Sequence, residues 1–508
     1  MEVELKLLVE RGDLDRVLTA GAVARRARGR ARTSELASVY FDTPDRRLFT
    51  QGLALRLRRS GERWTQTLKS DTAQGVGGAA GLHAREEYEW PVAGRRVDLS
   101  LLANTPYGSV FAGRRTQGEL RQVFSTRFRR TALALDLEGG ARAELCTDLG
   151  WIRAGKARAP ICEVEVELEP GAGRPAALFG FARELLQEVP FRLGARSKAE
   201  RGYAIARGEP PRPRKAEHIA LHADMNRAGA LLAIAQSCLG QVHANEEGFL
   251  LRRDPEFLHQ LRVGFRRLRV ALAMPEDPDW RAARGPLREE LRWLFSAIGP
   301  ARNWDVFLTE ILPPLLQQEG GDAGLAAFRA RCLRLRHRRL AAAREAVRGV
   351  RYTALLLAIG ELLAGPLPAE SPGQAASARS FARAVIERRD RALRRRGEAL
   401  AEASAEDRHR ARIAAKKLRY CAEFFAALHP HKRVKRYVEA LSDLQDALGA
   451  VNDAATCARL IGETGASGRV DGRTIGLVQG WVAAAEARAI EGLARAWDGF
   501  ARRTPFWT

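Results

Sequence analysis

The chain has 508 residues, of which 46% are hydrophobic, and it carries a formal net charge of +23 with a pI near 10.6. This length exceeds what one ordinary core supports and predicts about two to four domains. The apolar runs fall short of the roughly 18–20 residues that span a bilayer, so we expect no membrane insertion and a cytoplasmic location. The strong positive charge indicates a polyanionic partner.

The positive charge is unevenly distributed along the chain. Residues 1–210 hold 35 Lys/Arg and 27 Asp/Glu, a net charge of +8, which leaves +15 for the remainder. Because arginine greatly outnumbers lysine and alanine is abundant, a GC-rich genome is an alternative source of part of this excess. The six cysteines show no zinc-ligand spacing, and we expect them to be reduced thiols.

The chain begins with alternating charged and apolar residues, which predicts a β-strand. Successive strand side chains point to opposite faces, so Glu2, Glu4 and Lys6 share one face and Val3 and Leu5 the other. For a single strand, a solvated charged face is the ordinary interpretation.

Three later stretches repeat this alternation, which favours an enclosed charged surface instead. Their charged rows are Arg56 and Arg58, then Arg85, Glu87 and Glu89, then Glu163, Glu165 and Glu167. Several of these rows are dominated by one sign of charge. Closing such a sheet with the rows inward produces a polar lumen for divalent cations and a polyanion. We therefore predict an α+β multidomain protein whose first domain is a closed antiparallel β-barrel, or tunnel, with flanking helices near residues 13–18 and 175–188.

Eight short blocks in this region carry a family resemblance. They are residues 2–6 (ExExK), 40–43 (YFDT), 55–58 (LRLR), 67–69 (TLK), 81–85 (GLHAR), 124–130 (FSTRFRR), 161–167 (ICEVEVE) and 197–203 (SKAERGY). Together they resemble the CYTH domain of the triphosphate tunnel metalloenzymes, and most closely the bacterial inorganic triphosphatases of CYTH–CHAD architecture. The resemblance covers essentially residues 1–206.

The resemblance implies hydrolysis of inorganic triphosphate and assigns roles to the charged rows. Mg²⁺ or Mn²⁺ would be bound by Glu2, Glu4, Asp148, Glu163, Glu165 and Glu167. Phosphate oxygens would be held by Arg56, Arg58, Lys69, Arg85, Arg130 and Lys198. Lys6 would contact phosphate or assist proton transfer, and Glu87 would orient cations or help activate water. Asp148 lies in the sequence TDLG, which by itself indicates a turn.

Several alternatives stay open from the sequence. His83 is either a catalytic acid or base or a polar residue at a strand end. There is no Gly-x-Ser-x-Gly, no P-loop and no GxGxxG between a strand and a helix. The same tunnel chemistry suits thiamine triphosphate or ATP, the latter as a class IV type adenylyl cyclase, and a non-catalytic polyphosphate-binding scaffold is a further possibility. We do not expect nucleic-acid binding, because the basic helices lack interleaved aromatic residues.

The second part of the chain is predicted to be all-helical and internally duplicated. We expect a Pro-rich linker at 207–216 and a helical domain at 217–508, with repeat halves near 217–365 and 373–508. The pattern His-x-x-Arg-x-x-x-basic-basic-x-Arg begins at His259 and recurs at His409, an offset of 150 residues.

This repeated pattern resembles the CHAD domain, whose members bind inorganic polyphosphate. The implied polyphosphate-binding residues are His259, Arg262, Arg266, Arg267, Arg269, His409, Arg412, Lys416, Lys417 and Arg419. Asn303 stands where that family usually has Asp, whereas Asp305 is present. The resemblance also implies association with polyphosphate granules.

Overall fold

The computed structural model describes residues 2–70, 81–208, 210–365, 367, 377–398, 400, 402–465 and 470–507. The chain divides into two compact units, Met1–Arg212 together with Arg348–Leu367, and Pro213–Val347 together with Pro368–Thr508. In these described ranges, no helix is long and apolar enough to cross a membrane.

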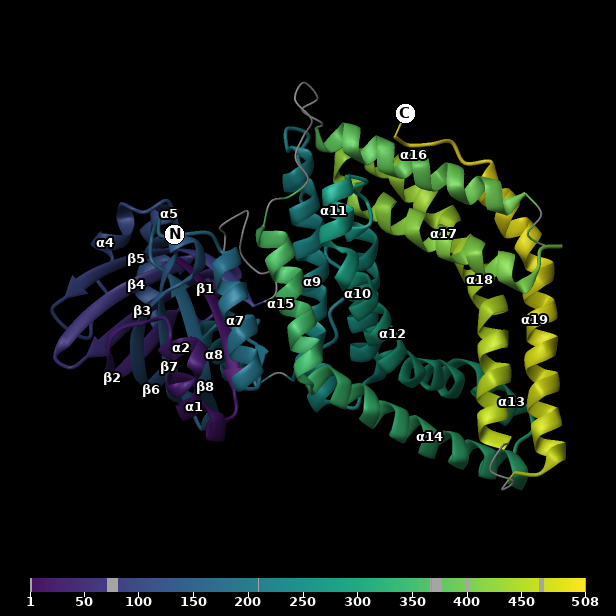
Figure 1. The fold of residues 1–508 in the computed structure, drawn as a ribbon, viewed down its shortest axis with the longest axis horizontal. Coiled ribbons are helices and arrows are strands. Elements are labelled where there is room, and N and C mark those ends of the chain that lie inside the picture. The colour runs from purple at the N-terminus through teal and green to yellow at the C-terminus, as the bar shows by residue number, and fades with distance from the viewer. Residues whose placement is uncertain are drawn as a thin grey trace. The chain divides into compact units, whose positions relative to one another are not determined.

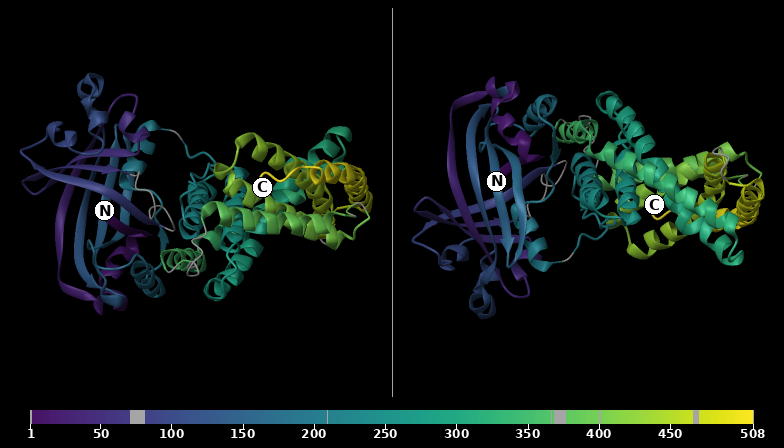
Figure 2. Two further views of the ribbon diagram at one scale, coloured as in Figure 1. Left: turned by 90° about the horizontal axis from the view of Figure 1, so that it is seen from above. Right: turned by 90° about the horizontal axis from the view of Figure 1, so that it is seen from below.

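The described part of the first unit contains one antiparallel sheet that closes on itself, which confirms the predicted barrel (Figures 1 and 2). Its strands are β1 (Glu2–Val9), β2 (Ala27–Asp42), β3 (Leu53–Ser60), β4 (Arg63–Ser70), β5 (Leu82–Val92), β6 (Arg121–Asp136), β7 (Arg142–Ala154), β8 (Ala157–Leu168) and β9 (Phe191–Leu193). The order is β5-β4-β3-β2-β6-β7-β8-β1-β9, and a β1–β5 pairing closes the barrel.

Strand alternation separates an apolar face from a charged face in this sheet. Leu5, Leu7 and Val166 are fully buried on one face of β1 and β8, so Glu4 and Lys6 point to the other. The described helices in residues 2–212 of this unit are α1 (Leu14–Thr19), α2 (Gly21–Ala24), α3 (Arg47–Thr50), α4 (Ser100–Ala103), α5 (Gly108–Ala112), α6 (Arg114–Glu119), α7 (Ala176–Glu188) and α8 (Lys198–Arg207). The charged rows therefore face the barrel interior.

One edge of β1 is shared by two strands. Residues from Glu2 to Leu5 pair with β5, and residues from Leu7 to Val9 pair with β9. Lys6 lies at the seam between them, because its carbonyl accepts a hydrogen bond from the Gly194 N–H at 2.8 Å. A Cβ at Gly194 would approach Lys6 Cγ to 2.6 Å, so glycine is required for this contact.

The predicted turn at Asp148 is wrong, because this residue lies in the middle of β7. Asp148 pairs with Arg130 of β6 and Glu163 of β8. The neighbouring Gly150 made the sequence look like a turn, but it serves close packing of strands. A Cβ at Gly150 would lie 2.4 Å from Phe128 Cα.

A helix from the second half of the sequence packs on the first unit. We expected residues 350–364 to belong to the helical domain, but α15 (Val350–Ala364) contacts α7 and β9. The Thr353 hydroxyl donates a hydrogen bond to the Phe191 carbonyl at 3.0 Å. A Cβ at Gly360 would lie 2.2 Å from the Phe179 ring, so a glycine permits the close contact with α7.

The second unit is helical, as predicted. Its helices are α9 (Arg227–Leu251), α10 (Pro255–Leu272), α11 (Pro278–Ala283), α12 (Gly285–Val306), α13 (Leu312–Gln318), α14 (Ala323–Arg348), α16 (Ala378–Gly397), α17 (Ala405–Phe424), α18 (His431–Gly465) and α19 (Gly472–Ala501). Helices α18 and α19 pack side by side along their length (Figure 1).

The helix positions reproduce the repeat seen in the sequence. Helices α10 and α17 begin 150 residues apart, at Pro255 and Ala405, and they contact each other. The N-cap residues of α9 and α16, Asn226 and Ser377, form an antiparallel bridge with one another. Corresponding elements of the two copies therefore lie together, as expected for a duplicated unit with approximate two-fold symmetry.

Candidate functional site

The interior of the barrel contains a cavity of about 240 Å³ lined almost entirely by charged side chains. Its cations are Lys6, Arg56, Arg58, Lys69, Arg85, Arg130 and Lys198, and its carboxylates are Glu2, Glu4, Glu87, Glu89, Glu165 and Glu167. Asp148 and Glu163, which the sequence placed with the metal ligands, are fully buried and do not line this cavity.

Glu2, Glu4 and Glu167 form the first group of carboxylates, here called the lumen group. Glu4 lies directly opposite Glu167 on neighbouring strands. Lys69 Nζ contacts Glu2 Oε2 at 2.5 Å. Burial and the nearby Glu2 carboxylate raise the pKa of Glu167 to about 8, despite the opposing effect of Lys69. Negative charge is therefore incompletely neutralised at this end of the cavity.

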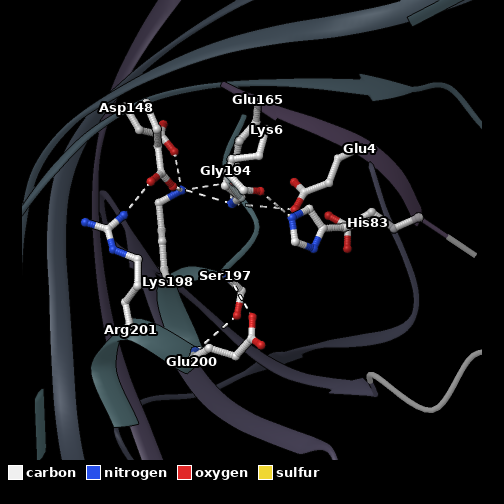
Figure 3. A network of polar contacts seen from close by, with 12 residues as sticks. Glu4, Lys6, His83, Asp148, Glu165, Gly194, Ser197, Lys198, Glu200 and Arg201 are labelled. Carbon is white, nitrogen blue, oxygen red and sulfur yellow. Dashed lines mark hydrogen bonds and ion pairs between the residues drawn. The ribbon is translucent and has the colours of Figure 1, made fainter. Parts of the chain in front are cut away.

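Asp148, Glu163 and Glu165 form the second group, here called the buried group. One carboxylate oxygen from each lies within 4.8 Å of those of the others, close enough to hold a metal ion. Lys198 Nζ lies among them, at 2.7 Å from Asp148, 2.5 Å from Glu163 and 2.8 Å from Glu165 (Figure 3). The side chain of a lysine thus occupies the position between these oxygens.

Three further cations bind the buried group. Arg130 binds Asp148 with two parallel hydrogen bonds of 2.7 Å and also contacts Glu165. Arg201 Nη1 donates to Glu163 at 2.6 Å, and Lys6 contacts Glu165 and, at 3.5 Å, Glu163. These contacts leave the buried group fully paired.

The electrostatics follow from this pairing. Burial alone would raise the pKa of Glu163, but Lys198 and Lys6 lower it to about 2. Burial would also lower the pKa of Lys6, yet Glu165, Glu4 and Glu163 raise it well above the usual lysine value. Lys6 therefore stays protonated at neutral pH, which favours a charge-pairing role over proton transfer.

The opposite wall of the cavity presents guanidinium and ammonium groups. Glu87 holds two of them, with Arg56 and Lys69 each at 3.2 Å. Arg58 donates from Nε to the Ser38 hydroxyl at 3.3 Å and forms no ion pair with any described residue. Burial and the neighbouring Arg56 and Arg130 lower the pKa of Arg58 to about 10. Among the described residues, Arg58 thus offers a positive charge that the nearby Glu89 offsets only in part, without a direct ion pair.

The position of Lys198 is set by the start of α8. Ser197 and Glu200 form a capping box, in which each side chain accepts a hydrogen bond from the other residue's backbone N–H (Figure 3). Glu200 also lies 3.6 Å from Arg85 Nη2. The N-terminus of this helix therefore fixes Lys198 and contributes to holding Arg85.

Four residues of this site received no individual role from the sequence: Tyr40, Glu89, Ser197 and Arg201. The first three line the cavity, and Arg201 supports it by binding Glu163. Strand parity was a usable signal for Glu89, which follows Glu87 by two residues. Helical spacing was a signal for Arg201, three residues after Lys198. Tyr40 was quoted only as part of a motif.

The basic residues predicted for the second unit separate into a surface cluster and others. Arg262 and Arg266 of α10 and Arg412 and Lys416 of α17 lie close enough for Arg266 to lower the pKa of the other three. Burial, and to a smaller extent the positive charge of Arg266, lowers the pKa of Lys416 to about 7. We call these four residues the basic cluster.

The remaining predicted residues have other surroundings. Arg267 is 2% exposed and donates to Gln241 Oε1 at 3.0 Å, which makes it part of the core. His409 is exposed, with Nδ1 2.7 Å from Asn452 Oδ1. His259 and Arg269 lie near the basic cluster on α10, whereas Lys417 faces Arg389 and Arg396, and Arg419 lies 3.6 Å from Glu423.

Comparison with known proteins relates both units to described families. The CYTH domain model matches residues 1–203, and the CHAD domain model matches residues 233–462. A curated relative, an inorganic triphosphatase from Haemophilus influenzae, is 31% identical over 172 residues. The aligned stretch covers 34% of this chain and 46% of the relative, so the chain spans about half the length of that protein.

Solved structures give a second line of comparison. The CHAD domain from the plant Ricinus communis is 30% identical, with a TM-score of 0.50 over 56% of this chain and 96% of that chain. PptA from Streptomyces chartreusis is 18% identical with a TM-score of 0.39, covers 55% of this chain and 99% of that chain, and is too distant to bear on function. The chain therefore carries a CYTH domain in residues 1–203 and a CHAD domain in residues 233–462.

Proposed function

We propose that the first unit hydrolyses inorganic triphosphate to diphosphate and phosphate with the help of a divalent cation. The observation that carries this proposal is a single cavity with under-neutralised carboxylates at one side and under-neutralised cations at another. Hydrolysis of a phosphoanhydride depends mainly on positioning and on charge neutralisation, and both are available here. The likeness to the Haemophilus influenzae inorganic triphosphatase supports the choice of substrate.

The lumen group fits a hard divalent cation such as Mg²⁺ or Mn²⁺. Glu2, Glu4 and Glu167 supply only carboxylate oxygens, the donors that these ions prefer. The raised pKa of Glu167 indicates that additional positive charge is favoured there. When bound, such an ion would polarise phosphoryl oxygens and make an attacking water more acidic. We assign the buried group to a different role, which is to hold Lys6, Arg130 and Lys198 in place.

The chain's own cations would bind the substrate. Arg58, Arg85, Arg130 and Lys198 line the cavity and would hold phosphoryl oxygens by charge-assisted hydrogen bonds. Arg56 and Lys69 would act with them, oriented by Glu87, which contacts both. Lys6 would remain protonated and hold Glu165 through their ion pair.

The test is phosphate release from inorganic triphosphate, ATP and thiamine triphosphate, with Mg²⁺ or Mn²⁺, by the full chain and its Glu4→Gln variant. We expect preferential hydrolysis of inorganic triphosphate that disappears in the variant. If the protein prefers ATP or thiamine triphosphate, the proposed substrate is wrong but the proposed tunnel mechanism still holds. Absence of hydrolysis with all three substrates would contradict the enzyme proposal.

A second function, polyphosphate binding, is proposed for the helical unit. The observation that favours it is the basic cluster, in which Arg262, Arg266 and Lys416 have few acidic partners. A linear polyanion would neutralise such a surface, and binding would weaken with rising salt. Measured binding of inorganic polyphosphate without any hydrolysis would favour a scaffold on polyphosphate granules, and absence of binding would contradict the targeting role.

A further inference from the structure

The two repeats of the helical unit differ at one acidic position. Asp453 in α18 corresponds, 150 residues earlier, to Asn303 in α12. In the second repeat, Asp453 Oδ1 lies 3.7 Å from Arg412 Nη2 and forms an ion pair with it, although Arg412 Nε has no hydrogen-bond partner among the described residues. The arginine that corresponds to Arg412 in the first repeat is Arg262, and the residue that corresponds to Asp453 is the amide Asn303.

Arg262 has no such partner. It forms no ion pair with any described residue, and its Nη1 is buried without a hydrogen-bond acceptor. Its neighbours are the cations Arg266 and Arg302, of which Arg302 is also 3.3 Å from Glu310. The guanidinium lies against the Phe295 ring, 5.8 Å from its centroid, so the aromatic face supports the cation but leaves its N–H groups unsatisfied.

We propose that the first repeat contains a built site for one phosphate group, formed by Arg262 with Arg266 and Arg302, and that Asp453 occupies the equivalent position in the second repeat. A bound phosphate oxygen would take the place of the missing carboxylate and accept a hydrogen bond from Arg262 Nη1, which has no acceptor among the described residues. This inference rests on the proposed polyphosphate binding and adds a polarity to it. The polyanion is held more tightly by the α10 side of the basic cluster than by the α17 side.

The test is the affinity of the full chain for long-chain inorganic polyphosphate, measured in EDTA so that the tunnel contributes equally in every variant. Asn303→Asp restores a carboxylate at the position that Asp453 holds in the second repeat, and we expect it to weaken binding by about tenfold. Asp453→Asn releases Arg412, and we expect binding to stay the same or tighten. Arg262→Gln should likewise weaken binding by about tenfold and the matched Arg412→Gln by less than about threefold.

The outcomes separate this proposal from the function on which it rests. Absence of polyphosphate binding by the wild type would overturn both. Binding by the wild type with equal losses in Arg262→Gln and Arg412→Gln, or with no effect of Asn303→Asp, would overturn the asymmetry alone. Melting temperatures identify any variant that has lost its fold. If an arginine variant is unfolded, Asn303→Asp and Asp453→Asn test the asymmetry instead, because both substitutions are nearly isosteric.

A separate observation concerns His83, at the seam where β5 and β9 meet along β1. Its Nε2 lies 2.9 Å from the Gly194 carbonyl, and Arg85 Nη2 lies 3.1 Å from its Nδ1 (Figure 3 shows His83 and Gly194). A carbonyl only accepts and a guanidinium only donates, so Nε2 carries the hydrogen and Nδ1 accepts. Both ring nitrogens are engaged, and the ring is neutral.

We infer that His83 is a positioning residue that aims Arg85 into the cavity and joins the ends of β5 and β9. The hydrogen bonds leave no ring nitrogen available for proton exchange with a substrate. Arg85 is thereby held from one side by His83 and approached from the other by Glu200, at 3.6 Å. This inference rests on the proposed binding of triphosphate in the tunnel.

The test compares His83→Gln, which keeps a donor and an acceptor, with His83→Phe, which keeps only bulk. We expect His83→Phe to raise the KM for triphosphate about tenfold with a smaller change in kcat, and His83→Gln to stay within about threefold of wild type. The rise in melting temperature caused by triphosphate gives a second readout that does not require activity. A kcat loss above about 100-fold in both variants, or unchanged triphosphate binding in His83→Phe, would overturn the inference.

Discussion

The lumen group and the buried group each contain three carboxylates on neighbouring strands of the same barrel, yet their surroundings are opposite. The buried group is surrounded by Lys6, Arg130, Lys198 and Arg201. Of these cations, Lys198, Lys6 and Arg201 lower the pKa of Glu163 to about 2 against the opposing effect of burial. The lumen group is contacted by Lys69 and, through Glu4, by Lys6 at 3.6 Å, and the pKa of Glu167 is raised to about 8.

Under the proposed assignment, closeness of carboxylates does not by itself identify a metal site. By distance alone the buried group would be chosen as the metal site, because its carboxylate oxygens lie within 4.8 Å of one another. A metal ion there would have to displace cations that are already hydrogen-bonded, at a large electrostatic cost. The lumen group has less of that compensation, so a divalent cation would mainly relieve repulsion between its carboxylates.

The largest expected effect is loss of hydrolysis in Glu4→Gln. Removal of one lumen carboxylate should reduce triphosphate hydrolysis by more than about 100-fold, because even outer partners of a metal site contribute 10–100-fold. Steady-state phosphate release measures the effect, and circular dichroism checks the fold. Retained hydrolysis in Glu4→Gln would show that the lumen group does not hold the catalytic metal.

A change in the buried group should instead affect stability. Asp148→Asn leaves Arg130 and Lys198 without their shared, fully buried partner. We expect a loss of about 3 kcal/mol in the free energy of unfolding, since breaking a buried ion pair strands a charge. Chemical denaturation measures this loss, and Mn²⁺ binding to the folded fraction should be unchanged. Unchanged stability with weakened Mn²⁺ binding would place the metal in the buried group.

Arg58 tests the cationic wall. It has no ion pair among the described residues, so Arg58→Gln should raise the KM for triphosphate about tenfold without a loss of stability. Arg201→Gln is the matched control, because Arg201 binds Glu163 and not the cavity. A larger effect on KM from Arg201→Gln than from Arg58→Gln would contradict this assignment.

The smallest expected effect is a pH dependence. With its pKa raised to about 8, the Glu167 carboxyl is protonated below that value in the metal-free protein, so protons compete with the metal. Mn²⁺ affinity should therefore rise by a few-fold between about pH 7 and 8 and then level off. In the metal-free protein, a raised carboxyl pKa means that stability falls as pH rises from about 4.5 through 8.

Glu167→Gln supplies the control for both pH effects. It should remove the rise in Mn²⁺ affinity and flatten the decline in metal-free stability between pH 5 and 9, because the amide does not titrate. Calorimetric titration and thermal melting at several pH values measure the two effects. A steep pH dependence that persists in Glu167→Gln would assign the titration to another group.

The sequence predicted the barrel and the inward direction of the charged rows, because strand alternation fixes which residues share a face. Glu2, Glu4, Arg56, Arg58 and Glu87 all line the cavity for this reason. Alternation carries no information on depth, so it did not separate Asp148 and Glu163 from the residues that line the cavity. The separation depends on side chains from α8 and β6, which meet these carboxylates only in the folded chain.

Long-range packing also explains what the sequence did not reveal about the helices. The 150-residue repeat predicted the correspondence of α10 and α17, since duplicated sequences fold alike. The sequence placed residues 350–364 within the helical domain and did not reveal the partner of this segment. Its contacts with α7 and β9 depend on Thr353 and Gly360, which resemble any other polar or small residue in a helix.

The most direct test of the central claim is the Mn²⁺ dependence of triphosphate hydrolysis in the wild type, Glu4→Gln and Glu163→Gln. If the lumen group holds the metal, Glu4→Gln loses activity at every Mn²⁺ concentration. Folded Glu163→Gln should require nearly the same Mn²⁺ concentration as the wild type. The account would be contradicted by active Glu4→Gln, or by a Glu163→Gln protein that is fully folded and needs far more Mn²⁺.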